Sequence, residues 1–449
     1  MLLSEKEARA VTDKLLGMTK ADDASVGVSS ETYSHLRFAA NSFLTSGRRE
    51  NVSANVTVWI DKKRGAASTN DVDDASLRAA VEEAERLARL APVDREYIPT
   101  LGLQTYKPTL GYSESAANVS LADRAKQVGD IIAASEKAGV VSAGFHQAQA
   151  TAAASATRNG NFDYQRRSNV SLAMTARTAD GEGSGYFMRS HFDAARLDTA
   201  RVSREAIRRA LETRAARPLE PGTYTVVLEP QAVADLISGL AFAFDARSAE
   251  EGRSAFSAPG GKTKLGEKIF DERINVLSDP WRADLPGSQS AQAGLPAQVV
   301  YLVKNGVLEN LTYSRFWAQQ RQRQPTHGPV NVIVEPTGQP APVEEMIRTT
   351  QRGLLVSRFW YIRQVDPRTQ TLTGLTRDGV WLIENGKVSH AVRNFRFNQS
   401  ITGMLAPGNV ELIGAPERVG SSEGQGGNAA LLPALKLKAF NFTSQSEAV

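Results

Sequence analysis

The chain has 449 residues with a formal charge of +4, and it is 41% hydrophobic and 23% charged. These values are ordinary for a soluble globular protein of two or three domains and exclude a largely disordered or coiled-coil chain. Disulfides, thiolate nucleophiles and cysteine-ligated zinc are also excluded, because the sequence has no cysteine. Its five histidines are scattered, with no two in helical metal-ligand register. No apolar run approaches the roughly 20 residues of a membrane helix, so we expect no membrane association.

The beginning of the chain predicts a helix followed by antiparallel strands. Ser4 and Glu7 have the spacing of a capping box before an amphipathic stretch. Acidic residues and the lack of a continuous apolar core distinguish this start from a secretory signal, so we expect a cytoplasmic protein. Residues 25 to 69 alternate between polar and apolar side chains, which predicts strands with turns at 46–47 and 62–65.

The next part of the chain alternates between predicted helices and strands. A helix is predicted to start at residues 73–74, where two aspartates favour a helix N-terminus. Residues 92 to 118 look irregular, and a second helix is predicted from 120 to 137. Residues 139 to 192 predict a second antiparallel set, and 194 to 214 a basic amphipathic helix.

The segment RPLEPG at 217–222 is the best candidate for a domain boundary, because it places two prolines and a glycine before an apolar strand. We therefore expect an N-terminal α+β domain, residues 1–216, built from an antiparallel sheet and helices. A β-rich domain, residues 217–449, is expected around one central helix from 232 to about 246. Hairpins are predicted in both parts of the chain at the Asn-Gly pairs 159–160, 305–306 and 385–386.

Two generic catalytic patterns occur without the context that their chemistry needs. Gly261-Lys262-Thr263 is similar to the end of a phosphate loop, but Phe256 stands where that loop needs its first glycine. Residues 420–424 fit G-x-S-x-G, but GQGGN follows, which cannot begin the helix of a nucleophile elbow. The carboxylate pair at 250–251 is expected in solvent just after a helix. None of these patterns supports a catalytic site.

Aromatic and basic residues concentrate in two segments. The first, ENLTYSRFWAQQ, leads into a basic cluster at 315–323 that could contact phosphates but is better explained as a solvated surface, so we expect no nucleic-acid partner. The second is VSRFWYIRQVD. Both segments are candidates for the lining of a cavity or an interface. Core packing at a domain junction is an equally good explanation for Phe359 and Trp360.

Four long stretches resemble the TldD/PmbA family, in the right order and over nearly the whole chain. They are NVTVWIDKKRGAASTNDVDDASLRAAVEEAERLARLAP, TVVLEPQAVADLISGLAFAFDARSAEEGRSAFS, GLTRDGVWLIENGKVSHAVRNFRFNQS and VGSSEGQGGNAALLPALKLKAFNFT. The resemblance implies a two-domain α+β protein that works in pairs around an enclosed cavity. In that family the TldD-type subunit is a zinc peptidase whose central helix has H-E-x-x-x-H, with a cysteine in a C-terminal glycine-rich loop.

This sequence lacks every one of those groups. Ser238 and Ala243 stand at the positions that match the two histidines. Gly239 matches the glutamate, and Gly420 matches the cysteine. The chain therefore resembles the PmbA (TldE) type of subunit, and we expect no catalytic, cofactor-binding or metal-binding residue in it. Leu240, Phe242 and Phe244 are expected to fill the former metal pocket.

The leading hypothesis is a metal-free subunit of a TldD/TldE-type cytoplasmic peptidase complex. It would shape the chamber and present unfolded or modified peptides to a partner that holds the zinc. A stand-alone homodimer that binds peptides without cleaving them is the alternative. A third possibility is an enzyme with relocated, metal-independent chemistry at Ser238 or Ser422.

Overall fold

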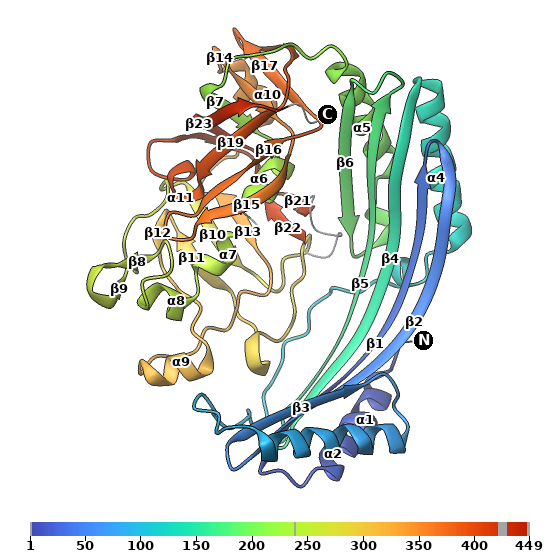
Figure 1. Cartoon of the computed structure of the whole chain (residues 1–449), viewed down its shortest axis with the longest axis vertical. Coiled ribbons are helices and arrows are strands. Elements are labelled where there is room, and N and C mark those ends of the chain that lie inside the picture. Colours follow the sequence, from blue (N-terminus) through green and yellow to red (C-terminus); the bar gives the residue numbers. More distant parts are fainter. Residues whose placement is uncertain (1, 238, 421–428, 447–449) are drawn as a thin grey trace.

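The N-terminal part of the chain is a strongly curved, fully antiparallel sheet (Figure 1). The computed structural model describes residues 2–237, 239–420 and 429–446. The sheet has six strands in the order β3-β2-β1-β4-β5-β6. Their bounds are β1 Asp23–Ala39, β2 Ser42–Ile60, β3 Lys63–Thr69, β4 Val140–Thr157, β5 Phe162–Thr178 and β6 Ser184–His191.

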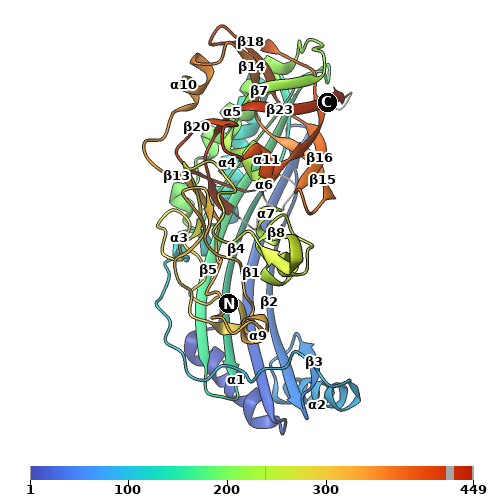
Figure 2. The same ribbon diagram turned by 90° about the vertical axis from the view of Figure 1, so that its left-hand side faces the viewer.

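Helices cover one face of this sheet, and the other face is open and polar. The helices are α1 Glu5–Met18, α2 Asp74–Leu90, α3 Glu114–Ala117, α4 Leu121–Lys137 and α5 Thr199–Thr213. Alternation along β4 explains the choice of face, because Ala148 and Ala154 are buried under helices while Gln149 and Thr151 point the other way. Figures 1 and 2 show that the open, concave face is turned toward the C-terminal part of the chain.

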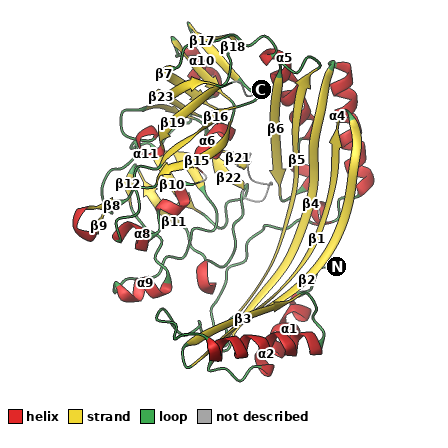
Figure 3. Cartoon of the chain, viewed as in Figure 1, coloured by secondary structure: helices red, strands yellow, loops and turns green. Residues whose placement is uncertain are grey.

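Two further sheets make up most of the C-terminal part (Figure 3). In the described residues, the nine-stranded sheet has the order β15-β16-β19-β23-β7-β14-β17-β18, with β20 paired to β23. Its strands are β7 Gly222–Leu228, β14 Arg352–Val356, β15 Phe359–Asp366, β16 Thr371–Thr376, β17 Val380–Glu384, β18 Lys387–Ala391, β19 Phe395–Ser400, β20 Val410–Ile413 and β23 Leu435–Gln445.

The smaller of these sheets has six strands in the order β12-β11-β10-β13-β22-β21, so β21 is an edge strand of its described part. Its strands are β10 Ile274–Ser278, β11 Val300–Lys304, β12 Val307–Leu308, β13 Ile333–Pro336, β21 Glu417–Gly420 and β22 Ala429–Leu432. A separate pair is formed by β8 Ser257–Ala258 and β9 Lys262–Thr263.

One helix lies between these two sheets. In α6 Pro230–Ile237, every residue from Gln231 to Ile237 is buried, and its side chains share one core with both sheets. The other helices of this part are short: α7 Leu240–Ala243, α8 Ala246–Glu250, α9 Arg315–Gln320, α10 Val343–Arg348 and α11 Ile401–Met404. The single central helix predicted to run from 232 to 246 is thus shorter, because Gly239 lies in a turn between α6 and α7.

The α+β fold predicted from the sequence is confirmed, and so are the hairpins at the three Asn-Gly pairs. The turn predicted at 46–47 is wrong, because both residues lie inside β2. The chain turns instead at Ala40-Asn41, where both residues have positive φ. Gly47 leaves room for a side chain of the neighbouring strand, since a Cβ there would lie 2.8 Å from the ring of His35. None of the helices in the described residues has the length and apolar character needed to cross a membrane.

Candidate functional site

The residues that the sequence resemblance matches to the family's metal ligands lie around α6. Gly239 occupies the turn after α6, Ala243 is the last residue of α7 with 3% of its surface exposed, and Gly420 is the last residue of β21. Ser238 lies outside the described residues. A hydrogen bond of 2.6 Å, from Nε2 of Gln231 to the carbonyl oxygen of Gly420, joins α6 to β21.

A second buried side chain of α6 extends this link. Oδ1 of Asp235 accepts a hydrogen bond from Nε2 of Gln231 at 3.1 Å, and Oδ2 accepts one from the main-chain N–H of Phe359 at 3.0 Å. Both side chains are almost fully buried, where an unmade hydrogen bond costs about 1–3 kcal/mol. Gln231 and Asp235 therefore fix the place of α6 relative to β21 and the start of β15.

The side chains at this place do not fit a zinc ion. A catalytic zinc site takes three protein ligands from thiolate, imidazole or carboxylate groups. Gly239, Ala243 and Gly420 have no such group, and both oxygens of Asp235 accept hydrogen bonds. Elsewhere in the part of the chain that the structure describes, no three histidine, aspartate or glutamate side chains lie close enough together to hold a metal ion.

A buried ion pair lies beside α6, at the junction with the N-terminal sheet. Arg358 and Asp378 approach to 3.1 Å with only 4% and 3% of their side chains exposed. The Ser184 hydroxyl of β6 donates to the other oxygen of Asp378. The guanidinium carbon of Arg358 lies 3.9 Å from the ring centroid of Tyr186. Burial raises the pKa of Tyr186 to about 12, so this hydroxyl stays protonated at neutral pH.

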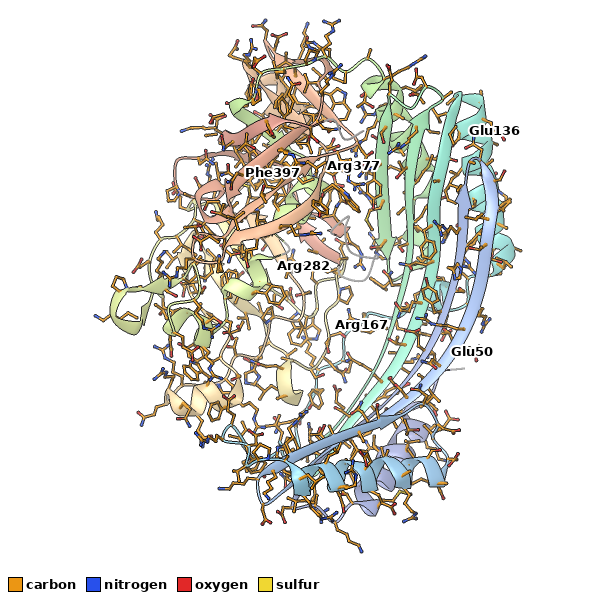
Figure 4. All side chains as sticks on the ribbon, in the orientation of Figure 1. Glu50, Glu136, Arg167, Arg282, Arg377 and Phe397 are labelled. Carbon is orange, nitrogen blue, oxygen red and sulfur yellow. The ribbon has the colours of Figure 1, made fainter. Side chains whose placement is uncertain are left out.

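Two arginines from distant parts of the chain line a small cavity between the sheet and the C-terminal part. The cavity has a volume of about 220 Å³ and is lined by Arg167 of β5 and Arg418 of β21, together with Gly111, Gln149, Thr151, Ser168, Asn169, Phe192 and Pro286. Figure 4 shows Arg167 on the open face of the sheet. Nη2 of Arg167 donates to the carbonyl of Pro286 at 3.0 Å, and Nε of Arg418 donates to that of Ser190 at 3.0 Å.

This cavity is positively charged. Neither Arg167 nor Arg418 forms an ion pair with a carboxylate of the described residues. Burial, reinforced by the nearby Arg167, lowers the pKa of Arg418 to about 10. Both side chains remain charged at neutral pH, and guanidinium groups bind carboxylates in a planar, two-point geometry. The arrangement can therefore bind an anion.

Two predictions about side chains near α6 need correction. Leu240 and Phe244 are buried as expected, but Phe242 is 81% exposed because α7 is a single turn that buries only its ends. Glu250 was expected in solvent. Its side chain is only 12% exposed, and it accepts hydrogen bonds from Tyr313 at 2.9 Å and from Trp317 at 3.0 Å. The first aromatic segment thus packs against the end of α8.

The sequence did not point to Arg167, Arg418 or Tyr186, whereas Arg358 belongs to the second aromatic segment, VSRFWYIRQVD. Strand alternation places Arg167 on the face of β5 that also includes Asn169, but it does not show what faces that side. The partners of Arg167 and Arg418 come from segments more than 100 positions away, as in the contact of Arg167 with Pro286. The one available signal was the position of Arg418, two residues before Gly420.

Comparisons with known proteins match both parts of the chain. Residues 221–444 match the model of the PmbA/TldA metallopeptidase C-terminal domain, and residues 24–88 match that of PmbA/TldA metallopeptidase domain 1. A "Metalloprotease" from Methanothermobacter thermautotrophicus is 26% identical over 309 residues, which are 66% of this chain and 63% of the relative. The aligned region thus spans less than two thirds of that relative. An uncharacterized protein from Methanocaldococcus jannaschii is 38% identical over 90 residues, which are 20% of each chain.

Solved structures show the same fold. TldE from Thermococcus kodakarensis superposes with a TM-score of 0.85 at 17% identity, over 97% of this chain and 99% of that one. A putative modulator of a DNA gyrase from Thermotoga maritima gives a TM-score of 0.83 at 16% identity, over 97% and 100% of the two chains. A putative modulator of DNA gyrase from Bacteroides thetaiotaomicron gives a TM-score of 0.82 at 18% identity, over 99% of this chain and 100% of that one. At these identities the likeness establishes the fold.

Proposed function

Because the chain belongs to the PmbA/TldD metallopeptidase family, we propose that it is a non-catalytic subunit of a TldD/TldE-type peptidase complex. In this proposal a partner subunit with H-E-x-x-x-H holds the zinc ion and its general base. This chain supplies no catalytic, cofactor-binding or metal-binding residue. It forms part of the chamber wall in the cytoplasm and brings unfolded or modified peptides to the partner's zinc.

The proposal is supported most strongly by the side chains at the positions that the family resemblance assigns to the zinc ligands and the general base. Gly239, Ala243 and Gly420 have no ligating side chain. In H-E-x-x-x-H the two histidines are five positions apart, and no two of the five histidines in the sequence have that spacing. The space between α6 and β21 is instead bridged by the bond from Gln231 to Gly420. A zinc-dependent step in this complex would therefore have to take place on the partner.

The cavity with Arg167 and Arg418 suggests how a peptide would be held. Arg418 is in β21, an edge strand of the described part of its sheet, and the main-chain groups of such a strand are suited to pair with an extended peptide of any sequence. The two guanidinium groups would then bind the free carboxylate at the end of that peptide. Together they would fix the direction of the peptide without reading its side chains.

Hydrolysis assays on the separate and combined subunits test the proposal. The purified chain, given a mixture of unfolded fluorogenic peptides, should show no turnover with or without added zinc. Turnover should appear when the H-E-x-x-x-H partner is added. It should disappear when the glutamate of the partner's motif is changed to glutamine, while the size of the complex stays the same.

Other outcomes of these assays would reject the proposal. Turnover by this chain alone, unaffected by a chelator, would show metal-independent chemistry in the chain itself. A chain that forms only homodimers, binds peptides and fails to activate any such partner would be a stand-alone peptide-binding protein. The size of the complex in solution distinguishes the two results.

A further inference from the structure

A buried arginine without a counter-charge lies on the helix-covered side of the sheet. Arg124 of α4 is 3% exposed, and its Nε and Nη1 atoms are fully buried without any hydrogen-bond partner. Across the described residues its guanidinium forms no ion pair. A buried charge that is neither paired nor hydrogen-bonded costs several kcal/mol. A bound anion would remove this cost by supplying the missing charge.

The same arginine lines a cavity at the N-terminal end of α4. The cavity has a volume of about 530 Å³, within the range of about 300–1,000 Å³ that is usual for small-molecule sites. Its walls combine hydroxyl groups with small apolar side chains and two arginines: Thr32, Ser34, Ser46, Ala117, Val119, Ser120, Leu121, Arg48 and Arg124. One wall is thus suited to an anion and another to a short apolar group.

The electric field in this cavity favours a negative charge. The N-terminus of the 17-residue helix α4 opens onto it, and unpaired N–H groups there attract anions. Arg48 and Arg124 both lie in the wall, and their repulsion adds to burial in lowering the pKa of Arg124. Arg48 is paired with Glu50 at 2.6 Å, so the uncompensated charge is that of Arg124. The carboxylate of the first helical turn, Asp123, does not neutralise Arg124, because it is exposed and bonded to the Ser120 hydroxyl at 2.6 Å.

The neighbouring histidine does not supply a counter-charge either. His146 is fully buried beside Arg124, and its Nε2 contacts the Gln127 side chain at 2.8 Å. Burial and the charge of Arg124 together lower the pKa of His146 to about 4. At neutral pH this imidazole is therefore uncharged, and Arg124 remains an uncompensated cation.

We propose that this cavity binds a small organic oxoanion, whose carboxylate or phosphate group contacts Arg124 and the N-terminus of α4. A short apolar part of the ligand lies against Ala117, Val119 and Leu121. The site is separate from the cavity of Arg167, because α4 covers the face of the sheet opposite the C-terminal part (Figure 1). It does not depend on the function proposed above.

Thermal unfolding of the full chain in Tris chloride, with ionic strength held constant by KCl, tests the site. Three probes are added separately: inorganic phosphate, butyrate and butyl phosphate. We expect a saturable rise in Tm of about 2 °C or more for the wild-type chain with at least one probe, because a ligand that binds only the folded state stabilises it. A larger rise in Tm with butyrate than with the two phosphates, or the reverse, identifies the head group. A larger rise with butyl phosphate than with inorganic phosphate shows that the apolar part of the ligand contacts Ala117, Val119 and Leu121.

Two variants make the test specific. Arg124→Met should lose the response to every probe and, without a probe, should unfold at the same or a higher Tm than the wild type, because it removes an unpaired buried charge. Lys126→Met, an exposed position of the same helix, should respond like the wild type. If Arg124→Met does not fold, calorimetric titration of the wild-type chain with the same probes decides. No response of the wild type to any probe, or an unchanged response in Arg124→Met, overturns the proposal.

Discussion

The Asp378→Asn substitution removes the charge that neutralises Arg358 at the junction of the N-terminal sheet with the C-terminal part. The two side chains are 3% and 4% exposed and 3.1 Å apart, and Ser184 of β6 bonds to the same carboxylate. Removing one member of a buried pair leaves an uncompensated charge, which costs about 3–5 kcal/mol. We expect the free energy of unfolding to fall by that amount.

Urea unfolding followed by tryptophan fluorescence measures this loss. For an m-value of about 3 kcal/mol/M, a loss of about 3 kcal/mol lowers the midpoint by about 1 M. The control is Asp130→Asn, which breaks a pair of 3.1 Å whose side chains are 79% and 70% exposed. Exposed pairs of this kind contribute about 0.3–0.5 kcal/mol, so its midpoint should change little.

A third variant separates the effect of charge from that of shape. Arg358→Met combined with Asp378→Asn removes both charges and should recover part of the stability lost in Asp378→Asn alone. Equal midpoints for Asp378→Asn and Asp130→Asn would refute the reasoning. So would a double variant that is less stable than Asp378→Asn by a further 3 kcal/mol or so, since the buried charge would then not be the cause of the loss.

Three further predictions concern binding, packing and pH. Arg418→Gln should raise the Kd of peptides with a free C-terminal carboxylate by about 10-fold or more, as expected for a lost bond between charged groups. The Kd of amidated peptides should not change, and fluorescence polarisation measures both values. Gly65→Ala should sharply lower the Tm, because its Cβ would lie 2.0 Å from the carbonyl oxygen of Ala84 in α2. By contrast, Gly17→Ala, with no atom within 4 Å, should raise the Tm slightly. The free energy of unfolding should fall as the pH is lowered from 6.5 to about 4, because the unfolded chain takes up a proton on His146 that the folded chain does not. In a series of unfolding midpoints against pH, the His146→Gln variant should lack this part of the fall.

The N-terminal sheet was largely predictable because its information is local. Alternation along β4 determines which side chains are buried, and the Asn-Gly pair at 159–160 sets its hairpin. Local rules failed where a glycine serves a contact between strands. Gly47 was interpreted as a turn residue, but it makes room for the His35 ring on the neighbouring strand, a contact that appears only once the register is known.

The side chains of the candidate site were harder to predict, because their roles depend on contacts between distant segments. Glu250 was interpreted as a solvated carboxylate, whereas Trp317 and Tyr313, more than 60 residues later in the chain, bury it. Arg418 and Arg167 are 251 positions apart and meet only in the folded chain. The resemblance to a known family located α6 and Gly420, but it gave no indication of the arginine cavity beside them.

Native mass spectrometry of the chain isolated from its own cells, combined with metal analysis, tests the central claim most directly. The account predicts a complex of this chain with one similar-sized partner that has the H-E-x-x-x-H motif. All zinc should remain with the partner when the two are separated. Stoichiometric zinc bound to this chain alone, together with peptide hydrolysis by it, would contradict the account.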